Sequence, residues 1–204
     1  MRDKEATRER ILEAAEAVFA EKGYHDTIMD EIVAASSTSK GAIYFHFPSK
    51  EDLFFSLMDR LASSLLREVE RAIAGQRGAV AKVQAALEAV LKNLSRRRRL
   101  ARILLLQSYG LGAAFERKRL EIFERFAALI KKHLDEAVAE GSIPTIDTEV
   151  AAYAWLGAIH ELVVRWLHTS KPDPLKKTLP ALSGLFLRGI GFEPNPMKFE
   201  GGKR

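Results

Sequence analysis

The chain contains no cysteine. This absence excludes disulfide bonds, thiol catalysis and cysteine-ligated zinc. Histidine is also scarce, and the five histidines show neither the H-x-x-x-H nor the H-E-x-x-H spacing, so we expect no metal site. No nucleophile, base and acid stand together in a pattern typical of catalysis. The sequence therefore predicts a protein that is not an enzyme and holds no cofactor.

Long apolar runs are missing as well. None approaches the roughly 18 residues that a membrane-spanning helix needs. The N-terminal stretch MRDKEATRERILEAAE is charged and has a helical pattern, unlike a signal peptide. We therefore expect a soluble, cytoplasmic protein with no membrane partner.

Patterns typical of β-strands are almost absent, whereas apolar residues recur at helical spacing along all 204 residues. We expect an all-α fold of about nine helices. Three short helices should fill residues 1–50, and the longer helices of 51–192 should be followed by a polar tail at 193–204. After a helix that runs from the cap Ser49-x-x-Asp52 to Gly75, the predicted helices are 79–95, 97–109, 115–140, 147–169 and 174–190.

Glycine, proline and capping residues give the boundaries of the three short helices. The first should end at Gly23, a natural C-terminal cap. Thr27-x-x-Asp30 resembles a capping box that opens the second helix, with Ile28 and Ile32 facing inward. Thr38 or Ser39 should cap the third helix, which ends before Pro48.

The net charge of +5 and the isoelectric point of about 9.4 permit a polyanionic partner. The charge is not concentrated at the N-terminus, because residues 1–50 hold seven Lys and Arg against nine Asp and Glu. Any nucleic-acid surface in this part must therefore be a local face.

The two short helices joined at residues 34–37 form a helix-turn-helix pattern on the first helix. The second helix of such a pair enters the major groove, so its first residues must be small or able to form hydrogen bonds. The segment SSTSKGAIYFHF at 36–47 meets this demand, with Ile43 and Phe47 facing inward. The candidate DNA-binding residues are Thr38, Ser39, Lys40, Gly41 and Ala42 in the groove, Tyr44 and His46 at the flanking backbone, and Thr27 and Lys50 at helix starts that suit phosphate.

Short capped helices with aromatic residues also occur in ordinary all-α cores. Periodicity alone therefore leaves DNA binding and plain core packing both open.

Residues 7–54 closely resemble the DNA-binding domain of the tetracycline-repressor (TetR) family. The matching elements are R-x-x-I-L-x-A-A-x-x-x-F-x-x-x-G-Y at 8–24, Thr27, Ile32, S-K-G-A-I-Y-x-x-F at 39–47 and S-K-E-D-L at 49–53. The resemblance implies an all-α homodimer with a three-helix DNA-binding domain and a larger ligand-binding domain. It also implies repression through double-stranded operator DNA, with release when a small molecule binds.

The chain departs from the family pattern at one place. Members usually carry Ala-Gly-Val where this chain has Ser36-Ser37-Thr38. A glycine suits a left-handed turn residue, so Ser37 predicts mild strain or a slightly different turn. This departure concerns the positioning of the third helix rather than the fold.

Residues 102–111 and 151–167 are apolar on most faces, which indicates burial on two sides. The family resemblance implies that the last two long helices pack against those of a second copy as a four-helix bundle. Helices 147–169 and 174–190 suit this role because they carry small residues, although intrachain packing explains some of these positions too. The small residues are Gly157, Ala158, Gly184 and Gly189.

Four adjacent arginines stand in SRRRRLAR at 95–102. They can form a solvated, salt-bridged surface, or an anion site at the mouth of an apolar tunnel. The second interpretation suits an amphipathic effector such as acyl-coenzyme A, with its phosphates outside and its acyl chain inside. The candidate ligand-binding residues are Arg98, Arg99, Arg102, Leu105, Tyr109, Phe123, Phe126, Trp155, Ile159 and Leu162.

The whole chain, notably EGSIPTIDTEVAAYAWLGAIHELVVRWL at 140–167, is similar more loosely to the fatty-acid-degradation (FadR-like) repressors of the TetR family. This similarity implies control by long-chain acyl-coenzyme A. A regulator of drug efflux that senses a hydrophobic drug and a helical acyl-lipid carrier protein remain as alternatives.

Overall fold

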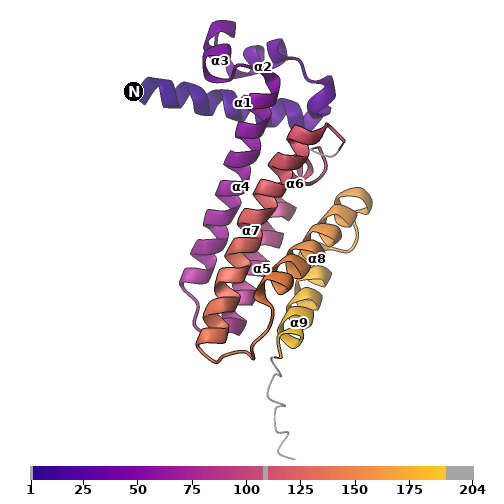
Figure 1. The fold of residues 1–204 in the computed structure, drawn as a ribbon. Coiled ribbons are helices and arrows are strands. Elements are labelled where there is room, and N and C mark those ends of the chain that lie inside the picture. The colour runs from indigo at the N-terminus through magenta and orange to yellow at the C-terminus, as the bar shows by residue number, and fades with distance from the viewer. Residues whose placement is uncertain (1, 108–109, 192–204) are drawn as a thin grey trace, which may run out of the picture.

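The secondary structure is helical throughout the described part of the chain (Figure 1). A computed structural model describes residues 2–107 and 110–191, and these ranges contain nine α-helices, one π-helical turn and no strand. The all-α prediction is therefore confirmed. The helices are α1 (Arg2–Asp26), α2 (Met29–Ser36), α3 (Lys40–His46), α4 (Lys50–Ala74), α5 (Ala79–Arg96), α6 (Arg98–Leu105), α7 (Ala113–Ala139), α8 (Thr148–Thr169) and α9 (Leu179–Gly189), with the π-helical turn η1 (Pro174–Thr178) between the last two.

Helices α1–α3 form a compact unit at one end of the molecule, with α1 lying across the end of α4 (Figure 1). The regular part of α1 ends at Gly23, which has a φ of +84°. Its apolar residues Ile11, Leu12 and Phe19 are fully buried, and both Ile43 and Phe47 of the α3 segment face inward as predicted. The burial of these two apolar side chains therefore fixes α3 against the core of the molecule.

The predicted start of α2 is wrong by one residue. Thr27 is fully buried, and its hydroxyl donates to the carbonyl oxygen of Gly23 at 2.7 Å rather than capping the helix. The capping hydrogen bond at the start of α2 is instead made by the N–H of Ile28, which donates to Oε2 of Glu31 at 3.2 Å. Ile28 then precedes the helix and is 60% exposed, not inward.

Helices α5, α6 and α7 pack on α4, whereas α8 packs on α7 and α9 packs on α5 at the side away from α4 (Figure 1). The predicted helix 97–109 is shorter, since α6 ends at Leu105. The predicted helix 174–190 divides into η1 and α9. Pro180 explains the division, because it cannot donate a backbone hydrogen bond into the preceding turn. The polar tail predicted at 193–204 lies outside the described residues.

One apolar core crosses the predicted boundary between the two domains, which falls at the start of α4. Phe19 and Phe54 are fully buried in this core together with Ile103 of α6 and Phe115 of α7. Phe54 contacts Phe19 edge-to-face, with ring centroids 5.1 Å apart. The α1–α3 unit is thus packed directly on α4, α6 and α7.

No helix within 2–107 or 110–191 combines the length and the apolar character needed to cross a membrane.

Candidate functional site

The front of α3 is small, polar and exposed. The side chain of Ser39 caps the helix by accepting a hydrogen bond from the N–H of Ala42 at 3.1 Å. Lys40 and Gly41 are exposed, and a Cβ atom added at Gly41 would meet no atom within 4 Å. The first turn of α3 can therefore approach another molecule closely.

The turn before α3 is built around Ser37, which has a φ of +52° and a ψ of +37°. This is the left-handed conformation, so of the two predicted outcomes, mild strain or a different turn, the strained one is found; a residue with a Cβ adopts it at a cost of about 1 kcal/mol. The neighbouring hydroxyls stabilise the turn. The Oγ atom of Ser36 donates to the carbonyl oxygen of Val33 at 3.1 Å and lies 2.7 Å from Oγ1 of Thr38.

The one cationic side chain at the front of α3 is paired within the protein. Nζ of Lys40 lies 2.7 Å from Oδ1 of Asp30 on α2, and this hydrogen bond raises the pKa of Lys40. Both side chains are more than 60% exposed, so the pair is weak and easily exchanged for another anion. Lys40 can thus turn from Asp30 towards a phosphate or a base edge.

The rear of α3 carries aromatic residues on two faces. Tyr44 is 40% exposed, His46 is half-buried and Phe45 is 68% exposed, with Nζ of Lys4 lying 4.6 Å from its ring centroid. Phe45 is not among the surface contacts predicted from the sequence. Helical spacing does indicate that Phe45 is exposed, because Ile43 and Phe47 occupy the inner face of the helix and Phe45 lies between them in the sequence.

Two predicted DNA-binding residues face the protein instead. The hydroxyl of Thr27 is engaged with Gly23, as described above. The ammonium of Lys50 donates to the carbonyl oxygens of Tyr24 at 2.8 Å, Thr27 at 2.9 Å and His25 at 3.3 Å, and it lies 4.5 Å from the ring centroid of Tyr24. Lys50 therefore fixes the end of α1 to the start of α4, whereas Thr27 stabilises the turn that follows Gly23, and the phosphate contacts predicted for both side chains do not fit this arrangement.

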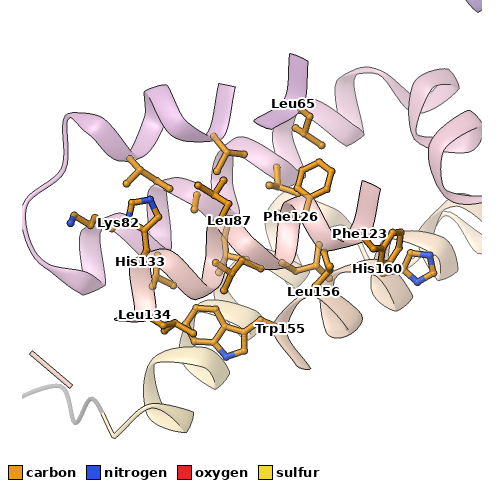
Figure 2. Close-up of a pocket in the computed structure, with 18 of the residues that line it drawn as sticks. Leu65, Lys82, Leu87, Phe123, Phe126, His133, Leu134, Trp155, Leu156 and His160 are labelled. Carbon is orange, nitrogen blue, oxygen red and sulfur yellow. The ribbon is translucent and has the colours of Figure 1, made fainter. Parts of the chain in front are cut away.

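A cavity of about 150 Å³ lies among α4, α5, α7 and α8 (Figure 2). Five of the predicted ligand-binding residues line it. They are Leu105, Phe123, Phe126, Trp155 and Ile159. Leu162 does not line the cavity but packs against a neighbouring cluster that contains Leu87 and Phe186, and Tyr109 lies outside the described residues.

Helices α4 and α5 contribute walls of the cavity that the sequence did not predict. Leu65, Val69 and Ile73 line the cavity from α4, and Leu87 and Val90 line it from α5. Their helical spacing does indicate one buried face on each helix. It does not distinguish a face that packs on a neighbour from one that borders a cavity.

Polar groups of the cavity lie at its two ends (Figure 2). At one end, Nδ1 of His133 is 2.9 Å and Nζ of Lys82 is 3.7 Å from Oε2 of Glu136, and the bond with His133 lowers the pKa of Glu136. At the other end, the ring of His160 contacts Phe123 edge-to-face at 5.2 Å, and burial lowers the pKa of His160. The wall between these ends is apolar, so the cavity suits an apolar chain.

The four adjacent arginines border a different hollow. A cleft of about 740 Å³ is lined by Glu9, Glu13 and Glu16 of α1, by Arg60, Leu61, Ser64 and Arg67 of α4, and by Arg96, Arg97, Arg98 and Arg99. We call it the arginine cleft. None of the predicted arginines, Arg102 included, is among the residues that line the apolar cavity, so the tunnel mouth predicted from the sequence does not fit this geometry. The chain bends at Arg97 between α5 and α6, and all four adjacent arginines are exposed.

Arg98 has a structural partner. Its Nη2 atom donates to the carbonyl oxygen of Leu167 at 2.9 Å and to Oγ of Ser170 at 3.2 Å, and its guanidinium lies 4.9 Å from the ring centroid of Trp166. Arg98 thus holds the C-terminal end of α8.

In 2–107 and 110–191, no group of three or more His, Asp or Glu residues is arranged to hold a metal ion.

Two sequence families match separate parts of the chain. Residues 11–57 match the family described as bacterial regulatory proteins, tetR family. Residues 76–189 match the family described as tetracyclin repressor-like, C-terminal domain. Together the two matches cover the α1–α3 unit and most of the helices that surround the apolar cavity.

Known proteins resemble the chain over most of its length. The fatty acid metabolism regulator protein of Bacillus subtilis (strain 168) is 25% identical over 191 residues, which is 93% of this chain and 98% of that protein. The structure of the transcriptional regulator FadR from Bacillus subtilis in complex with stearoyl-CoA has a TM-score of 0.77 at 26% identity, covering 91% and 98% of the two chains. The fatty acid degradation regulator FadR from Bacillus halodurans has a TM-score of 0.81 at 24% identity, covering 89% and 98%, and this likeness shows the fold alone.

Proposed function

Because the chain belongs to the tetR family of bacterial regulatory proteins, which are transcriptional regulators rather than enzymes, we propose that it is a repressor controlled by long-chain acyl-coenzyme A. In this proposal the protein binds a palindromic operator as a homodimer, and the effector releases it. The single observation that carries the effector class is the apolar cavity, with polar groups only at its ends.

The front of α3 is the proposed major-groove surface. Ser39 and Lys40 can donate hydrogen bonds there, Thr38 lies just before them, and the small Gly41 and Ala42 allow close approach. Tyr44 and His46 would reach the flanking phosphates.

Two observations support an acyl chain as the buried part of the effector. The cavity wall is built from leucine, isoleucine, valine, alanine and phenylalanine over most of its length. The FadR relative from Bacillus subtilis was crystallised with stearoyl-CoA. The cavity of about 150 Å³ is smaller than the roughly 300 Å³ of typical ligand pockets, so an acyl chain must separate the surrounding helices as it enters.

A hydrophobic cationic drug is the rival effector. Such a ligand would need a carboxylate beside its charge. Among the described residues that line the cavity, the only carboxylate is Glu140, which is exposed at the C-terminal end of α7. The lining therefore favours a neutral or anionic chain-bearing ligand.

The proposed homodimer uses α8 and α9, which lie together at one edge of the molecule (Figure 1). Val150 and Tyr153 of α8 and Leu185 of α9 are 64%, 48% and 57% exposed, an uncommon arrangement for large apolar side chains on neighbouring helices. An added Cβ at Gly157 or Gly189 would meet no atom within 4 Å. This edge can accept a second copy without rearrangement.

The test begins with selection of duplexes from a random DNA library by the full-length protein. We expect a palindromic operator, bound with a strong dependence on salt and released by palmitoyl-coenzyme A. Lys40→Ala and Tyr44→Ala should each weaken operator binding by about 10-fold, because each removes a base or phosphate contact. Their affinity for palmitoyl-coenzyme A should remain unchanged.

Lys176→Ala serves as the matched control, since Lys176 is an exposed lysine in η1, far along the chain from α3. It should keep wild-type operator affinity. If both α3 variants also kept it, the proposed DNA-binding surface would be wrong. If palmitoyl-coenzyme A left operator binding unchanged, the proposed effector would be wrong.

A further inference from the structure

We propose that the arginine cleft is a binding site for adjacent phosphate groups, and that these phosphates compete with the glutamates of α1. The site itself is independent of the proposed effector, whereas its effect on operator binding rests on the proposed function.

The cleft has a large excess of positive charge. Its lining contains six arginines and three glutamates. Within the described residues, the guanidinium groups of Arg67, Arg96, Arg97 and Arg99 form no ion pair and no hydrogen bond, although they share one cleft. Such a concentration of unpaired cations repels itself and attracts a polyanion.

The cleft also has a fixed inner wall. Arg60 is only 22% exposed and donates through Nη1 to Glu9 at 3.1 Å and through Nη2 to Glu16 at 2.7 Å. Its Nε atom is buried and has no hydrogen-bond partner among the described residues. A guanidinium of this kind is already oriented to bind oxygen atoms, and its planar set of donors matches phosphate as well as carboxylate.

Two further features suit phosphate groups. The cleft volume of about 740 Å³ lies in the roughly 300–1,000 Å³ range of small-molecule sites, so it leaves room for more than one phosphate group. Helix α6 begins at Arg98 beside the cleft, and the free N–H groups of its first turn add positive potential there.

The cleft and the apolar cavity share one wall. On α4, Leu65 lines the cavity, whereas Leu61, Ser64 and Arg67 line the cleft. On α5, Leu94 lines the cavity and Arg96 lines the cleft. The phosphates can therefore belong to a separate nucleotide, or to an acyl-coenzyme A whose chain passes this shared wall into the cavity when the surrounding helices separate.

The ion pairs of Arg60 connect the cleft to the α1–α3 unit. They join α4 to Glu9 and Glu16 on α1, the helix that supports α2 and α3. A phosphate that replaces these carboxylates as the partner of Arg60 breaks the ion pairs by which Arg60 joins α4 to α1. Binding in the cleft and the orientation of α3 are then linked, because each ligand favours a different state of the same contacts.

The first experiment is calorimetric titration of the full-length protein, at low salt, with pyrophosphate, coenzyme A, palmitoyl-coenzyme A and palmitate. The cleft variant is Arg97→Ala/Arg99→Ala. We expect it to lose about 10-fold or more in affinity for pyrophosphate and for coenzyme A, and to keep its affinity for palmitate. The matched control, Arg77→Ala/Arg117→Ala, removes two exposed arginines outside the cleft and should bind all four compounds like the wild type.

Palmitoyl-coenzyme A distinguishes the source of the phosphates. If its affinity falls together with that of coenzyme A, the cleft holds the phosphates of the effector. If only pyrophosphate and coenzyme A are affected, the cleft binds a separate phosphate ligand, and both results support the site. Equal losses in the cleft and control variants, or no binding of pyrophosphate and coenzyme A to the wild type, would overturn it.

The second variant tests the competition with α1. Glu9→Gln/Glu16→Gln removes both carboxylates that pair with Arg60 and should raise the affinity for pyrophosphate several-fold. An unchanged or lower affinity for pyrophosphate, in a variant that melts like the wild type, would refute the competition.

Operator binding separates the remaining outcomes. If Arg97→Ala/Arg99→Ala weakened operator binding in the absence of ligand and left pyrophosphate binding intact, these arginines would bind DNA instead of a phosphate ligand. Failure of palmitoyl-coenzyme A to release the operator would refute the proposed effector but not the pyrophosphate result.

Discussion

His160 is a polar side chain in a largely apolar wall. Burial lowers its pKa, and the positive charge of Arg119 acts in the same direction, while Glu161 opposes them. Its ring packs edge-to-face on Phe123, which also lines the cavity (Figure 2). The folded protein therefore favours the neutral imidazole, and protonation of His160 opposes folding.

This preference predicts acid sensitivity. Because the folded pKa of His160 lies below the unfolded value of 6.5, its contribution to stability is complete above pH 6.5 and is lost as the pH falls through the folded pKa. His160→Gln should therefore show a smaller fall in the free energy of unfolding between pH 7.5 and pH 5, measured by urea denaturation.

His25→Gln, which changes an exposed histidine in the last turn of α1, should keep the wild-type pH dependence. A His160→Gln protein with the full wild-type loss at pH 5 would contradict the assignment of this effect to His160.

At the scale of elements, the turn between α2 and α3 has an identifiable strain. Ser37 adopts the left-handed conformation at φ +52°, and no hydrogen bond of its side chain is found in the described part of the chain. Glycine adopts this conformation without a steric penalty. The serine at this position therefore costs stability without a visible compensating contact.

Ser37→Gly should raise the free energy of unfolding by about 0.5–1 kcal/mol, because relief of the left-handed strain exceeds the extra entropy of glycine in the unfolded chain. Thermal or urea denaturation measures the change. Ala35→Gly, two residues earlier in α2, is the matched control and should lower stability by a similar amount, since glycine disfavours a helix. A lower stability for Ser37→Gly would mean that the serine side chain stabilises the turn.

The helices themselves were largely predictable from the sequence. Periodic apolar residues and caps such as Ser39 and Ser49 predict where helices begin, since both act within a few residues of the chain. The start of α2 was missed because the Thr27 hydroxyl bonds to Gly23 in the folded turn, a contact that no local pattern indicates.

The candidate site was predictable only in part. The exposure of the front of α3 was predictable because its small, polar composition is unusual for a core helix, whereas its binding to DNA stays a prediction. Leu105 and Phe126 were placed correctly in the cavity wall because the surrounding sequence is apolar on most faces. The arginines were placed at the wrong hollow, since their position depends on the bend at Arg97 and on the approach of α1 to α4. Such tertiary geometry is not contained in spacing along one helix.

At the scale of the whole molecule, the proposed homodimer depends on the edge formed by α8 and α9. Leu185 is 57% exposed on α9, and Leu120 is 51% exposed on α7. Leu185→Glu should convert the homodimer to monomers, because it places a charge in the apolar centre of the proposed interface. Light scattering coupled to size-exclusion chromatography measures the oligomeric state.

Operator affinity should fall when dimerisation is lost, by roughly 100-fold for Leu185→Glu, since a single copy can bind only one half-site at a time. Leu120→Glu introduces the same charge at an equally exposed leucine and should remain dimeric. A Leu185→Glu protein that stays dimeric would place the interface elsewhere.

The length of α4 has a mechanical consequence. Lys50 fixes one end of this helix to the α1–α3 unit, and Leu65 lies in the cavity wall further along it, about 22 Å away at 1.5 Å per residue. A rotation of about 5° around Leu65 displaces the Lys50 end by about 2 Å, and in the proposed homodimer opposite displacements of the two copies would change the separation of their α3 helices by about 4 Å. Hydrogen bonds to base edges tolerate only a few tenths of an ångström, so in the proposed repressor α4 would act as a lever that amplifies a slight widening of the cavity beyond that tolerance.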